Sequence, residues 1–223
     1  PPPRVCEMPT LTKEIYKLGI PSIIMYFLMT FYIVFLNMIL GRFSDAAITV
    51  LGLYYRLQSF FFIPLFAMHA CIVPILSFNY ARREYGRCRQ MMRNITIVSL
   101  AFMTIGTACF LLIPRCLLNI FTPTEEVLRV GIPAFRIIGI SFFPAVFSMT
   151  LPIFFQAVGQ LAPSIWLSLT RHVFCLMTLF YILSLIGLGW TWAAFPLAES
   201  ITGGVGIILY YHHWRTLKLR AIS

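Results

Sequence analysis

The sequence predicts an all-α integral membrane protein with six transmembrane helices, and its composition, its long apolar runs and its charge distribution support this. The chain has 223 residues, of which 60% are hydrophobic and 11% charged, and its mean hydropathy is +0.87. Charged residues make up about 25% of a typical soluble domain. Several apolar runs reach the ~20 residues that a helix needs to cross a hydrocarbon core, and they are far longer than the alternating segments of barrel strands. A soluble protein with a very large core is therefore a poor alternative.

Six spans can be placed between two polar segments. Residues 1–14 are polar and Pro-rich, which predicts a linker that enters the membrane. A six-helix bundle is predicted over residues 15–214, and a cytoplasmic tail over residues 215–223. The spans are expected at about 15–40, 48–77, 95–113, 127–155, 164–186 and 190–211.

The first span ends at the short turn Gly41–Asp45, and the second continues for about 30 residues to Ser77. This is long for one crossing, so the second span is expected to tilt or to kink at Pro64 and Pro74. The third span follows a basic loop and ends before Pro114.

The fourth span contains three prolines, Pro133, Pro144 and Pro152. Transporters often break helices with Pro or Gly near the binding site, because the freed backbone groups can face a cavity. We therefore expect the second and fourth spans to move or to line the cavity. The turn Gln156–Gln160 leads to the fifth span, and Gly187–Gly189 separates the fifth from the sixth.

A basic loop between the second and third spans determines the predicted orientation. Short loops rich in Lys and Arg remain in the cytoplasm. Eleven of the 17 Lys and Arg residues lie in the N-terminal segment, this loop and the C-terminal tail, and three lie on the opposite side. We therefore predict a multi-pass protein of the cell (inner) membrane, with both termini of this segment in the cytoplasm. The topology-determining residues are Arg82, Arg83, Arg87, Arg89 and Arg93.

The net charge of +10 is explained by anionic lipid headgroups better than by nucleic acid, because the basic residues flank membrane spans. The six cysteines are scattered without a Cys-x-x-Cys pair, so neither a metal site nor a disulfide framework is expected. The sequence also lacks a nucleophile–base pair and a phosphate-binding loop. An enzyme or a cofactor is therefore not expected.

Polar residues inside the spans are the candidates for chemistry, because an ionisable group in a membrane is costly to bury. Glu199 lies midway along the sixth span and requires neutralisation or a partner. Arg171 in the fifth span is a possible partner, although it could instead snorkel to the headgroups. Glu199 could serve ion or substrate handling, or structural pairing. Three neutral residues are further candidates for a substrate or ion path, or alternatively link helices by hydrogen bonds: Asn37, Gln58 and Gln156.

Six short stretches follow one another along nearly the whole chain: Gly19–Pro21, Asn37–Gly41, Ser77–Tyr80, Gln156–Gln160, Leu167–Arg171 and Pro196–Glu199. In this order and spacing they resemble the C-terminal half of the MATE (multidrug and toxic compound extrusion) transporters. The resemblance implies twelve helices in two six-helix bundles with a cavity between them. This chain would be the second bundle, and its partner would be the N-terminal six-helix bundle of the same polypeptide.

The resemblance also implies export of small organic cations coupled to sodium or proton entry. Some members of the family carry an acid in the first or fourth helix of the second bundle. Here those spans contain no membrane-embedded acid, and the first has Asn37 instead. The coupling ion, Na⁺ or H⁺, is therefore expected to bind mainly in the other bundle.

Two other functions remain open from the sequence. A lipid-linked sugar flippase of related architecture would keep more cationic residues facing its central cavity. A non-transporting scaffold subunit would tolerate replacement of Glu199 or Arg171.

Overall fold

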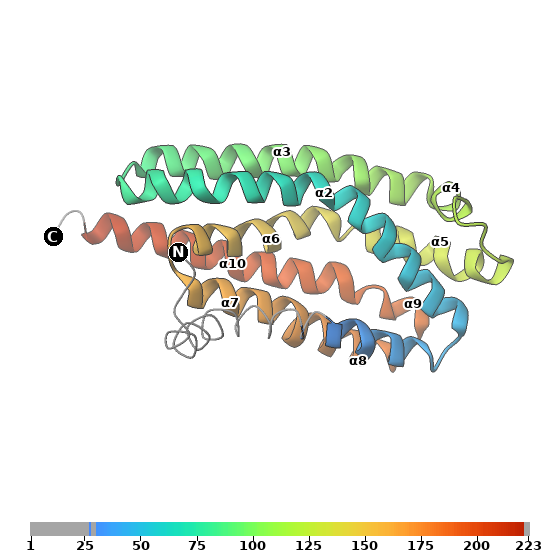
Figure 1. Cartoon of the computed structure of the whole chain (residues 1–223). Coiled ribbons are helices and arrows are strands. Elements are labelled where there is room, and N and C mark those ends of the chain that lie inside the picture. Colours follow the sequence, from blue (N-terminus) through green and yellow to red (C-terminus); the bar gives the residue numbers. More distant parts are fainter. Residues whose placement is uncertain (1–26, 28–29, 221–223) are drawn as a thin grey trace, which may run out of the picture.

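A computed structural model describes residue 27 and residues 30–220 as a bundle of helices, with no strand among these residues (Figure 1). The predicted linker over residues 1–14 and much of the first predicted span lie outside the described residues. The helices are Thr30–Leu40, α2 (Asp45–Ala81), α3 (Tyr85–Leu112), α4 (Pro114–Asn119), α5 (Glu125–Gly139), α6 (Phe142–Ala157), α7 (Leu161–Leu169), the π-helix η2 (Thr170–Met177), α8 (Thr178–Ser184), α9 (Leu188–Thr191) and α10 (Ala194–Arg220).

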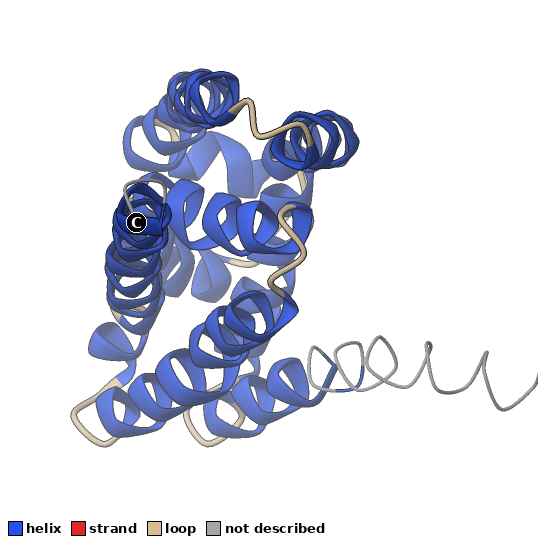
Figure 2. Cartoon of the chain, turned by 90° about the vertical axis from the view of Figure 1, so that its left-hand side faces the viewer, coloured by secondary structure: helices blue, strands red, loops and turns tan. Residues whose placement is uncertain are grey.

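The long helices lie side by side, and Figure 2 shows several of them nearly end-on. The most extensive contact between helices is that of α6 with α10, and α6 also packs against α3 and α7. α6 therefore occupies a central position in the bundle. Exposed apolar side chains on the long helices, such as Phe60, Ile105, Trp166 and Ile208, suit a lipid environment.

Local sequence signals determine where the helices begin. Ser44 caps α2, since its side-chain oxygen accepts a hydrogen bond from the backbone N–H of Ala47 at 3.2 Å, and Asp45 follows in the first turn. Thr124 caps α5 in the same way, with Glu125 and Glu126 in the first turn.

Four helical segments are long and apolar enough to cross a membrane, and the pair α5 and α6 makes a fifth if it is one span. The two members of this pair are bent by 52° relative to each other. The bend at Ile140 and Ser141 has a local cause, because Pro144 has no N–H to donate to the carbonyl of Ile140. The predicted break in the fourth span is therefore present.

The other spans differ from the prediction in detail. α2 remains one helix through Pro64 and Pro74, and Figure 1 shows it changing direction part-way along. Of the first predicted span, residues 30–40 form an apolar helix. The sixth span runs from Leu188 to Leu217, and α10 continues to Arg220. Residues 215–220 of the predicted tail are thus helical, because backbone hydrogen bonds continue beyond the apolar run.

An aromatic cluster, defined here as Tyr54, Phe61, Phe110, Phe135 and Phe142, joins α2, α3, α5 and α6. The ring centroid of Phe110 lies 4.8 Å from that of Phe142 and 4.9 Å from that of Phe135. Gly139 permits this approach, since a Cβ atom there would lie 2.6 Å from Cβ of Phe110. This side of the bundle is closely packed and apolar.

Candidate functional site

A buried ion pair joins the fifth and sixth spans. Arg171 on η2 contacts Glu199 on α10, with 2.6 Å between Nη2 and Oε1 and 2.9 Å between Nε and Oε1. Nε also lies 3.0 Å from Oε2. The side chains of Arg171 and Glu199 are only 15% and 11% exposed. The two charges therefore neutralise each other inside the bundle, as the pairing considered from the sequence requires.

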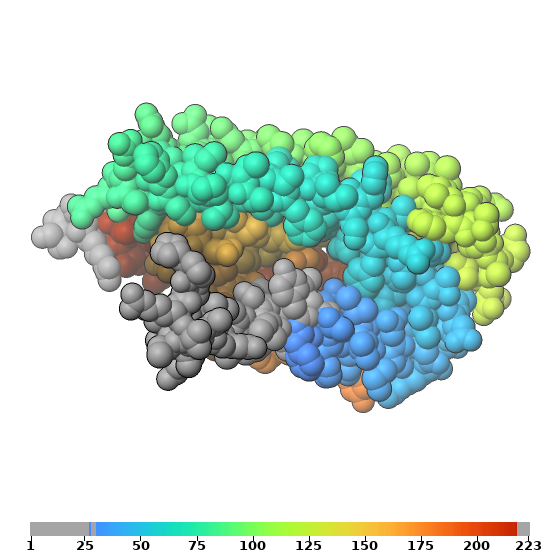
Figure 3. Space-filling model, viewed as in Figure 1, coloured from blue at the N-terminus to red at the C-terminus, as the bar shows by residue number. Residues whose placement is uncertain are grey.

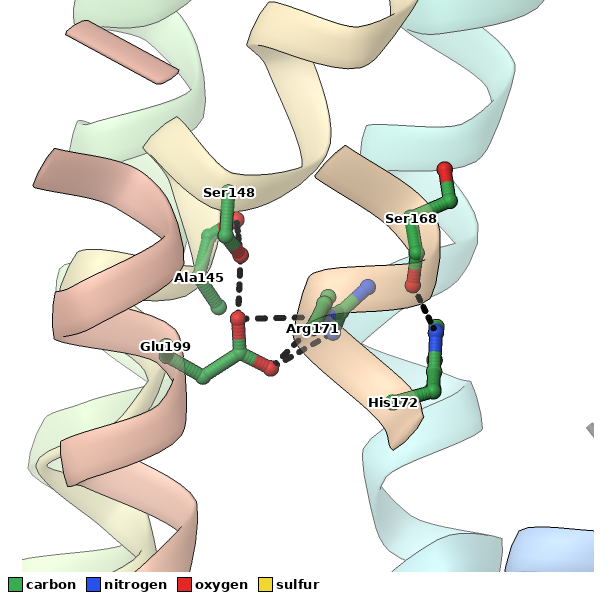
Figure 4. Close-up of polar contacts among 6 residues, drawn as sticks. All are labelled: Ala145, Ser148, Ser168, Arg171, His172 and Glu199. Atoms are coloured by element: carbon green, nitrogen blue, oxygen red, sulfur yellow. Dashed lines mark hydrogen bonds and ion pairs between the residues drawn. The ribbon is translucent and has the colours of Figure 1, made fainter. Parts of the chain in front are cut away.

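Ser148 on α6 completes this group, because its hydroxyl donates a hydrogen bond to Oε2 of Glu199 (Figure 4). The same hydroxyl lies 3.1 Å from the carbonyl oxygen of Ala145. A hydroxyl has one proton, so Ser148 can serve the carboxylate or the carbonyl but not both fully. Ser148, Arg171 and Glu199 are called the charged cluster below.

Small residues bring α6 and α10 close enough for this contact. A Cβ atom on Gly206 would lie 2.9 Å from a terminal carbon of Leu151. Glu199 projects from the buried face of α10, where Ala198 and Thr202 are each 1% exposed. Arg171 lies in the π-helical segment, a geometry that is rare and frequent at functional sites.

Two histidines lie near the charged cluster. Nδ1 of His172 is 3.1 Å from the carbonyl oxygen of Ser168, which can only accept, so Nδ1 carries a proton. The His172 ring also lies 5.0 Å from the ring of Tyr32. On α2, Nε2 of His69 lies 3.1 Å from the hydroxyl of Thr150, in a buried contact. Both histidines line the same cavity as Ser148 and Arg171.

A cavity of about 340 Å³ adjoins the charged cluster and lies between α2, α6, α7 and η2. Figure 3 shows α6, in amber, set back behind α2 on this side of the molecule. The lining combines apolar walls with polar groups, and its described residues are Phe66, His69, Ser148, Met149, Pro152, Ile153, Gln156, Leu161, Ser164, Ile165, Ser168, Arg171 and His172. Such a mixed cavity suits an amphipathic small molecule.

The structure brings together some of the residues that the sequence singled out. Arg171 and Glu199 are in contact, and Gln156 lines the same cavity. Asn37 and Gln58 are half-buried, and neither is among the described residues that line this cavity.

Sequence reasoning missed Ser148, His172 and the cavity itself. A serine in an apolar helix is common, so no local signal distinguishes Ser148. The described residues contain no group of three or more His, Cys, Asp or Glu side chains placed to hold a metal ion.

Comparison with known proteins places this geometry in a family. The MatE family model matches residues 21–182. This chain belongs to the MATE transporter family. It is similar to the multidrug export protein MepA of Staphylococcus aureus (strain bovine RF122 / ET3-1), with 24% identity over 90% of this chain and 44% of MepA. The MepA protein of Staphylococcus haemolyticus (strain JCSC1435) is 23% identical, with the same coverage.

Solved MATE structures have the same fold over half of their length. An inward-facing MATE transporter of the MOP superfamily matches with a TM-score of 0.87 and 19% identity, over 98% of this chain and 50% of that chain. An outward-facing one matches with a TM-score of 0.83 and 18% identity, over 94% and 48%. The chain thus spans less than half of its curated relatives and half of a solved transporter, which fits a six-helix half of the MATE fold in a multi-pass membrane protein.

Proposed function

We propose that this chain is one six-helix half of a secondary active transporter that exports organic cations or drugs by antiport with Na⁺ or H⁺. Membership of the MATE family and relatives named multidrug export protein support export. The observation that carries the proposal for this chain is the charged cluster at the wall of a mixed apolar and polar cavity. No enzymatic step is part of this proposal.

The charged cluster offers a way to couple cavity occupancy to helix position. A cationic group that entered the cavity would compete with Arg171 for the carboxylate of Glu199. Arg171 would then turn toward neutral polar groups such as the Ser168 carbonyl, while Glu199 stayed paired. The displaced guanidinium of Arg171 would then lack a counter-charge, which is costly in a membrane and favours a movement of η2 that brings it to water or headgroups. The exchange would therefore link the cargo to the relative position of η2 and α10.

The coupling ion is proposed to bind mainly in the other half of the transporter. Glu199 is the one carboxylate of the charged cluster, and Arg171 already holds it. A dedicated cation site requires free oxygen ligands. The partner is proposed to be an N-terminal six-helix bundle of the same polypeptide, which the double length of the relatives supports.

The proposed orientation places the ends of this segment in the cytoplasm of a cell (inner) membrane. Exposed arginines gather at the α2–α3 turn, and Figure 1 shows this turn at the same end of the bundle as the end of α10. Neutral replacement of Arg82, Arg83, Arg87 and Arg89 should disturb insertion or topology more than substrate preference. Reporter fusions after Leu112 check this, and an unchanged topology would contradict the assignment.

A flippase for lipid-linked sugars is the second candidate. Phosphate-bearing cargo requires free cationic side chains along the cavity. Among the described lining residues, Arg171 is the only Arg or Lys, and Glu199 already neutralises it. This favours drug export.

Ethidium accumulation in cells tests the proposal. A longer protein that contains this chain should lower accumulation, whereas this chain alone should leave it unchanged. Glu199→Gln in the longer protein should abolish most of the effect at equal membrane expression, while Asn94→Gln at an exposed position of α3 serves as a control. Export by this chain alone would contradict the proposal that it is one half of a transporter. Accumulation that neither protein changes, at verified expression, would favour the flippase or a scaffold.

A further inference from the structure

A second cavity, of about 380 Å³, lies where α3 and α10 meet at the end of the bundle that carries the arginine-rich turn. Its described lining consists of Arg89, Tyr210, Tyr211, Trp214 and Arg215. Its lining shares no residue with the cavity beside the charged cluster, and Tyr210 lies 11 residues beyond Glu199 on α10. Two arginines and three aromatic rings with polar edges around one hollow form a site that the transport mechanism above does not use.

The two arginines of this second cavity have no carboxylate partner among the residues that the structure describes. Within residues 30–220 the ion pairs are Arg87 with Glu84 and Arg171 with Glu199, so Arg89 and Arg215 are free of carboxylate partners there. The guanidinium of Arg89 lies 4.5 Å from the centroid of the Trp214 ring. This cation–π contact fixes Arg89 over the cavity and leaves its N–H groups available.

Trp214 anchors this arginine from below. Its side chain is 5% exposed and packs among buried residues of α3, α6 and α10, so the ring that carries Arg89 is held in place. Two guanidinium groups without a carboxylate partner among the described residues favour an anion with several acceptor oxygens, which is the chemistry of a phosphate.

An exposed stripe on α10 leads away from this cavity. Tyr211 and Arg215 lie on the same helical face as four apolar residues that are 39% to 69% exposed: Leu197, Ile201, Val205 and Ile208. At 1.5 Å per residue, Val205 lies about 15 Å along the helix from Arg215, half the ~30 Å thickness of a hydrocarbon core. The part of the stripe from Ile208 to Val205 therefore lies within the depth of one leaflet, and Leu197, about 27 Å from Arg215, lies beyond it.

We propose that this cavity binds the headgroup of an anionic phospholipid. Arg89 and Arg215 hold the phosphate, the ring of Trp214 positions Arg89, and one acyl chain lies along the apolar stripe of α10. The stripe selects a lipid over a free phosphate, because a soluble anion would make no use of an apolar track. Tyr and Trp at this depth are typical of the membrane–water interface. The bound lipid joins the start of α3 to the end of α10.

Native mass spectrometry of the full-length protein, purified in detergent, tests the assignment. The protein should retain phosphatidylglycerol about tenfold more tightly than phosphatidylcholine. Both lipids carry a phosphate, but the quaternary ammonium of phosphatidylcholine cancels its charge and is repelled by Arg89 and Arg215. Arg89→Gln with Arg215→Gln should reduce the preference to less than about twofold. Arg93→Gln is the matched control, since Arg93 is exposed one turn further along α3 and does not line the cavity. It should leave the preference unchanged.

A variant of Trp214 and a competition experiment with inorganic phosphate test the assignment further. Trp214→Leu removes the aromatic ring beneath the Arg89 guanidinium, and it should weaken phosphatidylglycerol retention about threefold to tenfold. Because Trp214 is buried, this variant should also melt at a lower temperature, so retention is compared well below that temperature. Inorganic phosphate at millimolar concentration should not displace the lipid. Equal retention of the two lipids, full retention by the double variant, or displacement by inorganic phosphate would each overturn the proposal.

Discussion

The aromatic cluster and the charged cluster lie in one bundle, but different forces hold them together. Around Phe110, rings from four helices pack at centroid distances of 4.8 to 6.3 Å, and all of the cluster except the half-buried Phe61 is buried. Dispersion between closely packed atoms offers one good arrangement, because every shift loses contacts. Around Glu199, three polar side chains hold each other by charge and hydrogen bonds, and those can be exchanged for other partners.

α6 connects the two clusters and carries a residue of each. Phe142 begins the helix within the aromatic cluster, and Ser148 lies six residues, or about 9 Å, further along. The bend before Phe142 therefore lies on the packed side, whereas the exchangeable contact lies beyond it. The comparison suggests a rigid frame that positions a replaceable ion pair, and the following substitutions test it from the largest expected effect to the smallest.

Removing one member of the buried ion pair should have the largest effect. Arg171→Met leaves Glu199 without its cation, and Glu199→Leu leaves Arg171 without its anion, so each should destabilise the fold by about 3–5 kcal/mol. The double variant should recover most of the stability, because no isolated charge remains. Thermal unfolding monitored by size-exclusion fluorescence in detergent gives the measurement.

Export separates a functional pair from a structural one. The double variant should be stable but inactive in ethidium export if exchange of partners drives transport. A double variant that regains both stability and export would reduce Arg171 and Glu199 to structural pairing.

Overpacking the aromatic cluster should have a smaller effect. In Gly139→Ala the new Cβ would lie 2.6 Å from Cβ of Phe110, and strain of this kind costs about 1–3 kcal/mol. Gly204→Ala is the matched control, because no atom lies within 4 Å of a Cβ at that position. Equal melting temperatures for the two variants would show that the aromatic cluster can shift to accommodate the added methyl group without loss of stability.

The smallest effect is expected at the edge of the cavity. Thr150→Val removes the hydroxyl that contacts Nε2 of His69 and should cost about 0.5–1.5 kcal/mol. Thr104→Val is the control, since that hydroxyl donates to the Leu100 carbonyl within its own exposed helix face. A loss at Thr150 no larger than at Thr104 would mean that the contact with His69 contributes nothing to stability.

The sequence was informative wherever a feature depends on neighbouring residues. Apolar runs predicted the membrane helices, and the three prolines of the fourth span predicted a break that is present as the 52° bend, although the helices continue through Pro133 and Pro152. Arg171 and Glu199 were detectable singly, because an ionisable residue in an apolar run is conspicuous. Their contact depends on the rotation of two helices whose residues are 28 positions apart, and the sequence constrains that rotation only weakly.

Other features depended on packing and had no local signal. Ser148 is 51 positions from Glu199, and serine is an ordinary residue in a membrane helix. The extension of α10 to Arg220 was missed because hydropathy follows the membrane, whereas helical hydrogen bonds continue into the polar region. The π-helical geometry around Arg171 likewise has no composition that marks it.

The π-helical geometry of η2 provides a way for the helix that follows it to rotate. A π-helical hydrogen bond spans five residues, whereas an α-helical one spans four. η2 therefore contains more residues per turn than α7 before it and α8 after it. Were one such bond to slip into α-helical register, the chain beyond it would turn by about 100° about the helix axis, the angle of a single residue. Arg171 lies at the start of this segment, next to the partner that it would leave. A register shift of one residue in η2 would therefore break the Arg171–Glu199 ion pair and rotate the following helix in a single step.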